Sequence, residues 1–530
     1  MITFDSLTLK AFLNENIDFL KGARINKIQQ PNRREFVFTL RNNGETRQFY
    51  ANINPQMYHV CFMSQENANK RLIEIPQKPP MFCMLLRKYL GNSRIAKVNQ
   101  PEYERILEFY IETYNELGDK IYLCLAFELM GKYSNVVLYN YDTNIILGCA
   151  HNVGAEKSRA REMFGTLPYV YPPKQNKSNI LDYNGELDYE NLANDFYWIS
   201  KYFATQCIGQ PLSKIKDFVQ LKNVSPVISQ DYQYYSLFQE LQPNSVSSSS
   251  VNEMIDSYYA YHISKEKFNN LKLHYTSVIS QKLKKVVKSL NQMNYQVLQN
   301  TENAKYRLWG DLLMANLYNL KDYSKSVSVY DYENDRQLVL KLDETKTIKD
   351  NANKFYKLYN KSKTSSSKLS ELIEDATQKK LYYERILYSI NIAENIDDLL
   401  ELSDEVEEQI SNIKKVKCSL EPMKIELENE TRIFIGKNNK QNDYIVSKLA
   451  DEDDLWFHTK DCAGSHVLLK TQLLTDDLIL KCANLAKKYS SAGNSSKVGV
   501  IYTKRKYLRK PPKAALGYVT YKNEKEIVID

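Results

Sequence analysis

The sequence predicts an α+β protein of several domains, and three observations lead to this prediction. At 530 residues the chain is too long for a single hydrophobic core. Its N-terminal third alternates helical and strand patterns, whereas residues 253–420 are polar and compatible with long helices. Residues 424–530 return to short apolar runs between polar turns. We therefore expect an N-terminal α+β domain, a small helical module, a long antiparallel coiled-coil arm and a C-terminal α/β domain.

Residues 1–175 form the predicted N-terminal α+β domain. Residues 2–21 have the apolar periodicity of an amphipathic helix. Strands are expected at residues 24–31, 35–41, 47–53 and 135–141. Asn-Gly and Pro turns separate these runs, so the pattern is typical of helices that pack on a sheet.

Residues 180–250 are predicted to form the helical module, and a serine-rich joint at residues 245–250 ends it. The arm follows over residues 253–420, with a small strand-like tip at about 326–352. Residues 265–300 hold seven lysines and one acid, whereas residues 394–408 hold eight acids and no base. This opposed charge predicts either that the helices pair or that one basic face is free for RNA.

Two polar turns between apolar runs make residues 431–470 the most distinctive part of the C-terminal domain. IFIG and YIVSKL, then LWFH and HVLLK, are predicted as strands that bracket these turns. We interpret the turns as an exposed surface that binds ribosomal RNA. Its candidate residues are Asn438, Asn439, Gln441, Asn442, Asp443, Trp456, His458, Lys460, Ser465 and His466. In the alternative interpretation the amides only shape the turns, and the aromatic rings pack beneath the sheet.

A basic stretch near the C-terminus is a second candidate for contact with RNA phosphates. Its charged residues are Lys504, Arg505, Lys506, Arg509, Lys510 and Lys513. A Pro-Pro pair is expected to keep the stretch extended, so that the charges remain accessible. Simple solvation of like charges is the alternative.

Several segments of the chain resemble the NFACT family, in the family order. The C-terminal ones are residues 435–443, 454–460 and 464–466. The N-terminal ones are residues 22–31, 79–88, 128–135 and 169–173, and the arm adds residues 310–316, 342–343 and 351–356. The resemblance implies an NFACT-R-like RNA-binding domain at residues 424–530. It also implies a helix-hairpin-helix module around residues 203–213, although most of the glycines of such a hairpin are missing here.

The resemblance also implies a site for transfer RNA in the N-terminal domain. The family has an Asp-Arg pair implicated in holding tRNA where this chain has Glu104 and Arg105. Further candidates for tRNA binding are Asp5, Arg24, Lys27, Arg87 and Lys88. Read without the family, Glu104 and Arg105 are a surface ion pair, Asp5 is a helix cap, and the other four are solvated charges.

The function that the resemblance implies is ribosome-associated quality control. Such a protein binds large (50S) ribosomal subunits that still carry nascent peptidyl-tRNA and recruits alanyl-tRNA. It then directs template-free addition of alanine to the nascent chain, which marks the chain for degradation. The ribosome forms the peptide bonds, so the protein itself is not expected to be an enzyme. A small RNA-binding helper protein of the RqcP type is an expected partner.

Other features exclude several classes of protein. The eight cysteines occur singly, and neither a signal peptide nor a long apolar run is visible, so a cytoplasmic location is expected. No phosphate-binding glycine loop, dinucleotide motif or HExxH occurs, so no cofactor is expected. His458, Cys462 and His466 have helical spacing for zinc, but Gly464 interrupts the helix, so no metal is expected.

Two alternatives to this function stay open. NFACT proteins have also been described as fibronectin-binding proteins, so a surface adhesin is one alternative. A nucleic-acid-processing enzyme that uses His458 or His466 is the other. The family's N-terminal domain is also similar to DNA glycosylases of the formamidopyrimidine type, but this chain opens with Met1 where those enzymes need a proline nucleophile.

Overall fold

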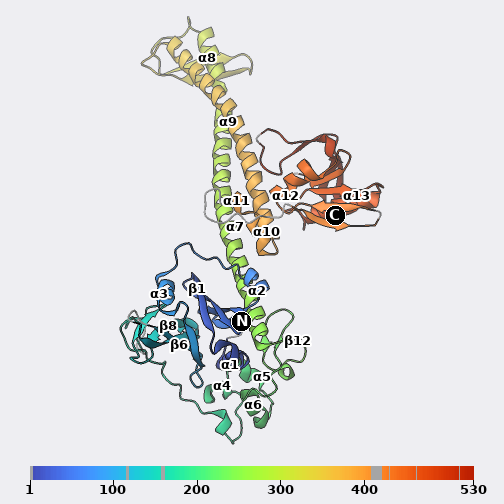
Figure 1. Ribbon diagram of the computed structural model, residues 1–530. Coiled ribbons are helices and arrows are strands. Elements are labelled where there is room, and N and C mark those ends of the chain that lie inside the picture. The colour runs from blue at the N-terminus through green and yellow to red at the C-terminus, as the bar shows by residue number, and fades with distance from the viewer. Residues whose placement is uncertain are drawn as a thin grey trace. The chain divides into compact units, whose positions relative to one another are not determined.

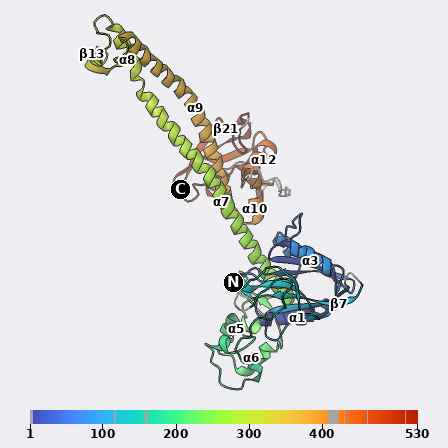
Figure 2. The same cartoon turned by 90° about the vertical axis from the view of Figure 1, so that its left-hand side faces the viewer.

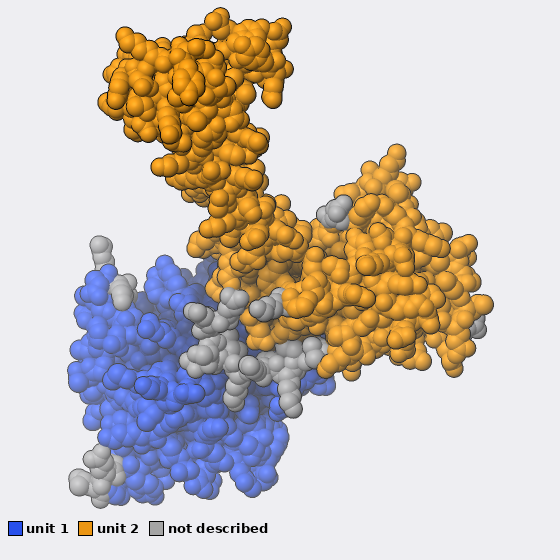
Figure 3. Space-filling model, turned by 90° about the horizontal axis from the view of Figure 1, so that it is seen from above, with its two compact units in different colours: residues 1–267 blue, residues 268–530 orange. Residues whose placement is uncertain are grey.

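The structure is a computed structural model that describes residues 4–114, 118–156, 161–406, 421–428, 430–460, 462–512 and 514–530. The chain divides into two compact units, residues 1–267 and residues 268–530 (Figure 3). Lys513 of the basic stretch and the predicted end of the arm, from residue 407 to residue 420, lie outside the described residues.

A nine-stranded antiparallel sheet forms the framework of the first unit, with the order β4-β3-β2-β1-β5-β6-β7-β8-β9. Its strands are β1 (Arg24–Asn32), β2 (Glu35–Asn42), β3 (Glu45–Asn52), β4 (His59–Met63), β5 (Arg94–Asn99), β6 (Ile106–Tyr114), β7 (Lys120–Glu128), β8 (Asn135–Asn140) and β9 (Ile146–Cys149). All four predicted strands are confirmed, as β1, β2, β3 and β8.

Three helices accompany this sheet: α1 (Ser6–Leu20), α2 (Gln65–Lys70) and α3 (Met81–Leu90). The carboxylate of Asp5 caps α1 by accepting the N–H of Thr8 at 2.8 Å, which confirms the helix-cap interpretation of Asp5. The apolar face of α1 is buried, and the ring of Phe12 lies 6.0 Å from Phe62 and 6.5 Å from Phe49. Burial of such a side chain contributes about 1.5–3 kcal/mol.

The module after the sheet is only partly helical. It contains α4 (Leu192–Asp195), α5 (Lys201–Gln206) and α6 (Leu212–Val219), which confirms the predicted helices. It also contains a small sheet that was not predicted, formed by β10 (Val227–Ile228), β11 (Tyr235–Ser236) and β12 (Val246–Ser247). Strands of two residues are too short to show a periodicity in the sequence. Gly209 turns the chain between α5 and α6 with φ +79°, a conformation that favours glycine.

The long helix α7 (Val251–Glu302) begins inside the first unit, where polar contacts hold it firmly. The carboxylate of Asp256 accepts hydrogen bonds from Arg71 at 2.5 Å and from Asn67 at 2.8 Å. Arg71 and Asp256 are both buried. At the start of α7, the carboxylate of Glu15 accepts the N–H of Val251 at 2.6 Å. The first turn of the arm is therefore part of the N-terminal core.

In the second unit, α7 and α9 (Ile348–Ile392) lie side by side and form the arm (Figures 1 and 2). The tip contains a hairpin of β13 (Ser326–Asp331) and β14 (Arg336–Lys341), where a strand-like tip was predicted, together with a separate helix, α8 (Lys305–Ala315), that was not predicted. At the other end, α10 (Ile396–Leu400) and α11 (Ser403–Val406) pack against both long helices around Tyr275 and Ile390. The basic helix does not pair with the acidic run through salt bridges among the described residues. Instead, the Nζ of Lys272 donates to two backbone oxygens at the end of α9. The distance is 2.8 Å to the oxygen of Asn391 and 3.1 Å to the oxygen of Ala393.

The C-terminal domain is a six-stranded sheet with the order β15-β16-β18-β17-β19-β22 and helices on both faces. The strands are β15 (Met423–Glu426), β16 (Arg432–Ile435), β17 (Leu455–Thr459), β18 (Val467–Lys470), β19 (Val498–Lys504) and β22 (Lys525–Ile529). Helix α13 (Asp476–Lys488) covers the face that carries Phe457, so packing beneath the sheet is confirmed for this ring. On the opposite face, Ile445 and Val446, which directly follow helix α12 (Asn439–Tyr444), pack around Trp456.

The predicted strand YIVSKL is wrong. Residues Ile445–Leu449 form a π-helical turn that continues α12. The side chain of Asn438 caps α12 by accepting the N–H of Gln441, so the chain is already helical where the apolar run begins. Ile445 and Val446 are buried against the sheet. An apolar run this short does not distinguish a buried helix from a strand.

Candidate nucleic-acid interfaces

A cleft in the first unit brings together three of the residues predicted to bind tRNA. Its volume is about 630 Å³. Asp5 lies on it at the start of α1, and Glu104 and Arg105 lie on it at the turn between β5 and β6. Residues of the helical module, from 193 to 202, complete the lining. We call this the first cleft.

Arg105 is one of three basic residues on the first cleft, with Lys177 and Lys201. Its Nη1 donates to the hydroxyl of Tyr58 at 2.8 Å, and the guanidinium lies 5.5 Å from the centre of that ring. Across the described part of the chain, no carboxylate lies within ion-pairing distance of Arg105, so the surface ion pair with Glu104 does not form. Burial lowers the pKa of Lys177, and the charge of Arg105 lowers it further. Burial raises the pKa of Glu104. Burial is the largest cause of both shifts, so both groups are partly withdrawn from solvent in the cleft.

The first cleft also holds aromatic residues that the sequence did not single out. The ring of Tyr103 stacks on Tyr197 at 4.3 Å and meets Trp198 edge-on at 5.4 Å. Tyr103 and Trp198 have φ angles of +65° and +68°, which are strained for bulky residues. Strained backbone of this kind concentrates at ligand sites. The run from Phe196 to Trp198 was the only sequence signal for this cluster.

The other four candidates for tRNA binding lie away from the first cleft. Arg24, Lys27 and Lys88 are exposed, and the Nε of Arg87 donates to the backbone oxygen of Ile28 at 2.8 Å. Arg24 stands opposite Arg41 on β2 and opposite Arg94 on β5. Like charges directly opposite one another on neighbouring strands are destabilising unless an anion neutralises them. These positions therefore remain candidates for a separate contact with RNA.

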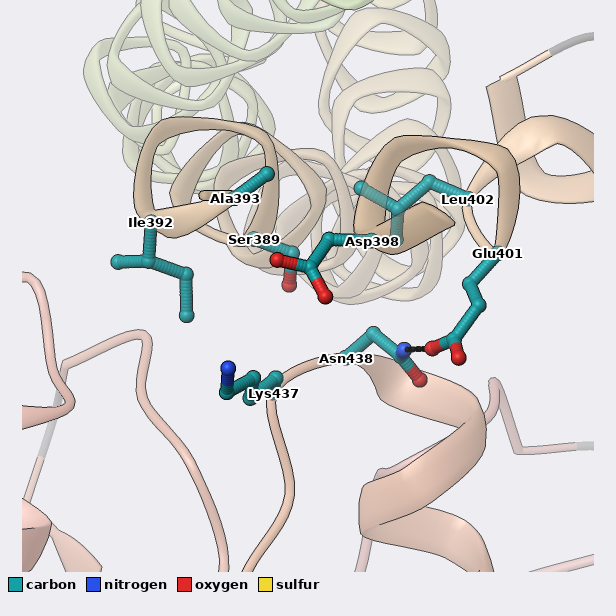
Figure 4. A pocket seen from close by; sticks show the side chains of 8 residues that line it. All are labelled: Ser389, Ile392, Ala393, Asp398, Glu401, Leu402, Lys437 and Asn438. Atoms are coloured by element: carbon teal, nitrogen blue, oxygen red, sulfur yellow. Dashed lines mark hydrogen bonds between the residues drawn. The ribbon is translucent and has the colours of Figure 1, made fainter. Parts of the chain in front are cut away.

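In the C-terminal domain, the predicted exposure of the first polar turn is wrong. The amide of Asn438 donates to the carboxylate of Glu401 at 2.6 Å (Figure 4). The amide of Gln441 donates to the same carboxylate at 3.0 Å. The amide of Asn439 donates to Glu405 at 2.8 Å. All three amide side chains are buried. This part of the domain contacts the acidic segment that follows α9, which comprises α10 and α11.

Ser465 and His466 of the second polar turn are also buried, whereas Lys460 is exposed. Oδ1 of Asn442 accepts the N–H of His466 at 3.0 Å, and the N–H of Gly436 donates to the oxygen of His466 at 3.0 Å. A Cβ at Gly436 would lie 2.2 Å from Oδ1 of Asn442, so only glycine fits there. Ser465 is buried and its N–H donates to Tyr489 at 2.8 Å. These residues shape the fold of the domain.

Trp456, His458 and His466 form one buried cluster. The Trp456 and His458 rings are parallel with centres 5.7 Å apart, and His466 lies edge-on to both. Burial lowers the pKa of His458 to about 4 and lowers the pKa of His466 well below its ordinary value. Both imidazoles are therefore neutral at pH 7. Within the described residues, no three His, Cys, Asp or Glu side chains come together as a metal site.

Most of the remaining basic candidates pair with carboxylates of the same domain. Lys504 and Lys506 both contact Asp453, at 3.0 and 2.9 Å. Lys460 contacts Glu526 at 2.7 Å, and Lys510 contacts Asp443. The Nε of Arg505 donates to the backbone oxygen of Val446, whereas the side chain of Arg509 is exposed. The stretch is not uniformly extended, because residues 505–507 form a 3₁₀ turn.

The helices of the described residues give no indication of a membrane span, because none is both long and apolar enough. The fold and the first cleft define a multidomain protein with an N-terminal cleft that carries Arg105 and Lys177, a helical arm and a C-terminal α/β domain. Residues 5–214 and 204–418 match the NFACT N-terminal and middle domains, and residues 424–523 match the RNA-binding domain of NFACT proteins. The chain therefore belongs to the NFACT family.

Whole-length relatives support this assignment. The chain is 27% identical to the Rqc2 homolog RqcH of Bacillus subtilis, over 100% of this chain and 98% of that protein. It is 28% identical to the Rqc2 homolog RqcH of Streptococcus suis, over 99% of this chain and 98% of that protein. The N-terminal part of the fibronectin/fibrinogen-binding protein of Streptococcus suis is 25% identical, over 48% of this chain and 99% of that structure, with a TM-score of 0.43.

Proposed function

We propose that this protein is a ribosome-associated quality-control factor. It binds large ribosomal subunits that carry nascent peptidyl-tRNA after a stall, recruits alanyl-tRNA, and directs template-free addition of alanine to the nascent chain. The peptide bonds are formed by the ribosome, so the protein contributes binding and positioning in the cytoplasm. A small RNA-binding helper of the RqcP type is a proposed partner.

The observation that carries this proposal is the first cleft. It joins Asp5, Glu104 and Arg105 with Lys177 and an aromatic cluster. Glu104 and Arg105 stand where the family has its Asp-Arg pair, with Glu in place of Asp. A guanidinium without a carboxylate partner binds phosphate in a forked geometry, and the half-buried rings of the cluster offer aromatic surface for stacking on unpaired bases. Whole-length similarity to RqcH proteins supports the same conclusion.

The C-terminal domain is proposed to contact ribosomal RNA through a smaller set of residues than the sequence suggested. Arg509 is exposed, and the paired lysines at 504, 506 and 510 are accessible enough to exchange a carboxylate for a phosphate. The buried residues of the two polar turns support this surface from below.

The test is to recover the tagged full-length protein from cell lysate at low and high salt and to sequence the RNA that accompanies it. We expect large-subunit RNA together with an enriched alanine tRNA, both reduced at high salt because phosphate contacts release counterions. Large-subunit RNA with a different tRNA would keep the role and change the amino acid that is added. Recovery of neither RNA at low salt would overturn the proposal.

A further inference from the structure

The two halves of the sheet in the first unit repeat one another in sequence. Residues 24–31 read RINKIQQP and residues 94–101 read RIAKVNQP. Both segments have the pattern Arg-Ile-x-Lys-aliphatic-x-Gln-Pro, at an offset of 70 residues. Each forms a strand directly after a helix, since β1 follows α1 and β5 follows α3.

The hydrogen bonds between the halves follow the same offset. The N–H of Ile25 donates to the oxygen of Ser93, and the N–H of Ile95 donates to the oxygen of Ala23, both at 2.9 Å. A shift of 70 residues relates Ile25 to Ile95 and Ala23 to Ser93, so the two hydrogen bonds are equivalent. Both strands also break register directly after this isoleucine. On either side of the β1–β5 pair, four strands follow in chain order, β1 to β4 and β5 to β8, and β9 extends the second half. These features indicate an internal two-fold relation between the halves.

This relation predicts a partner for the first cleft. The first cleft lies between the start of α1 and the turn from β5 to β6, so its equivalent lies between the start of α3 and the turn from β1 to β2. A cleft of about 1360 Å³ lies at that place. It is lined by residues 80–82 at the start of α3 and by Gln30, Arg33 and Arg34 at the turn. We call it the second cleft.

Arg34 takes the position in the second cleft that Arg105 takes in the first. Arg34 directly precedes β2, and Arg105 directly precedes β6. The backbone oxygen of Arg34 accepts the N–H of Ile53 at 2.8 Å, and that of Arg105 accepts the N–H of Leu129 at 2.8 Å. Each of these donors is the first residue after the third strand of its half, β3 or β7. The two arginines are therefore structurally equivalent.

The chemistry of the second cleft suits RNA. Arg33 and Arg34 are exposed, and no carboxylate of the described chain lies within ion-pairing distance of either. Burial lowers the pKa of His151 on the same cleft, and the charges of Arg34 and Arg33 lower it further. Tyr133 offers a ring that is 61% exposed, and Oε1 of the buried Gln30 has no partner among the described groups. Together these groups offer charge for a phosphate and a ring for a base.

We propose that the second cleft is a further RNA-binding site, at which Arg33 and Arg34 hold phosphates of the RNA that occupies the first cleft. The two clefts share Met130, Pro172 and Pro173 in their linings, so one RNA is able to extend across both. The proposal rests on the proposed function, which makes RNA the ligand of the first cleft.

The test compares binding of a purified alanine tRNA to the full-length protein and to an Arg33→Ala/Arg34→Ala variant over a range of salt. We expect binding roughly tenfold weaker and a log–log salt slope that is smaller by about two, because each lost phosphate contact removes about one unit. An Arg33→Lys/Arg34→Lys variant keeps the charge and should retain the slope. Lys120→Ala is the charge control, because Lys120 lies at the far end of β7 and pairs with Glu112.

Three results are distinguishable. A smaller slope in the double-alanine variant alone supports the second cleft. An unchanged affinity and slope in that variant, with normal tRNA binding by the parent protein, overturns the second cleft and leaves the proposed function intact. Absence of tRNA binding by the parent protein overturns both. Both arginines are exposed, so the melting temperature should not change and a folding defect is readily recognised.

Discussion

The side-chain amide of Asn439 donates a 2.8 Å hydrogen bond to the carboxylate of Glu405, and both side chains are buried. Burial raises the pKa of Glu405, and the bond from Asn439 opposes that shift. A buried carboxylate needs donors because it has lost its water. Asn439 therefore helps to hold the acidic segment of α10 and α11 against α12.

Replacement of Asn439 by alanine should destabilise this contact. Glu405 would lose a donor at a buried site, and we expect the free energy of unfolding of this region to fall by about 1–3 kcal/mol. Urea unfolding of the parent protein and the variant measures the change. Asn484→Ala is the control, because Asn484 is exposed on α13. Equal effects of the two substitutions would contradict the role of Asn439.

The buried histidines should make the C-terminal domain sensitive to acid. The pKa of His458 is about 4 in the folded domain and 6.5 in its ordinary state. The unfolded chain therefore binds more protons between these values, and stability falls as the pH drops from about 6.5 toward 4. The contribution of His458 is on the order of 3 kcal/mol. Unfolding measured at pH 7 and pH 4 should show a smaller loss for His458→Gln than for the parent protein. The exposed His274 provides the control, since His274→Gln should retain the full pH dependence.

The buried ion pair of Arg71 and Asp256 stabilises the packing of the first turns of α7 in the N-terminal unit. Removal of one partner from such a pair leaves a buried charge, so Asp256→Ala should cost about 3–5 kcal/mol. Thermal unfolding of the parent protein and the variant checks this value. Lys70→Ala breaks an exposed pair with Glu66 and should cost less than about 0.5 kcal/mol. A small effect of Asp256→Ala would show that the remaining contacts hold α7 without the pair.

The sequence predicted much of the fold because its patterns were local. The periodicity of residues 2–21 and the alternation of residues 35–41 report directly on a helix and a strand, and both were found. The arm and the hairpin at its tip were also predicted from local patterns, namely two long helix-compatible runs and a short strand-like segment between them. The run at 444–449 was misassigned, because the cap formed by Asn438 decides its conformation and short apolar runs do not.

The candidate sites were predicted less well, because burial depends on tertiary contacts. Asn438 and His466 have the composition of a polar surface, yet one faces the acidic segment and the other lies inside the domain. Nothing local in the sequence identifies Glu401 as the acceptor. Arg34 was missed for a different reason: its relation to Arg105 emerges only when the two halves of the sheet are superposed by their hydrogen bonds.

The most direct test of the central claim is binding by an Arg105→Ala variant. The affinities for tRNA and for the large subunit are measured in parallel. The Arg105→Lys variant is included because it keeps the positive charge but cannot form the two-pronged hydrogen bond of a guanidinium to phosphate. If the first cleft holds tRNA, Arg105→Ala should weaken tRNA binding about tenfold or more and leave large-subunit binding near that of the parent protein. Equal loss of both affinities, or loss of neither, would contradict the assignment of tRNA to the first cleft.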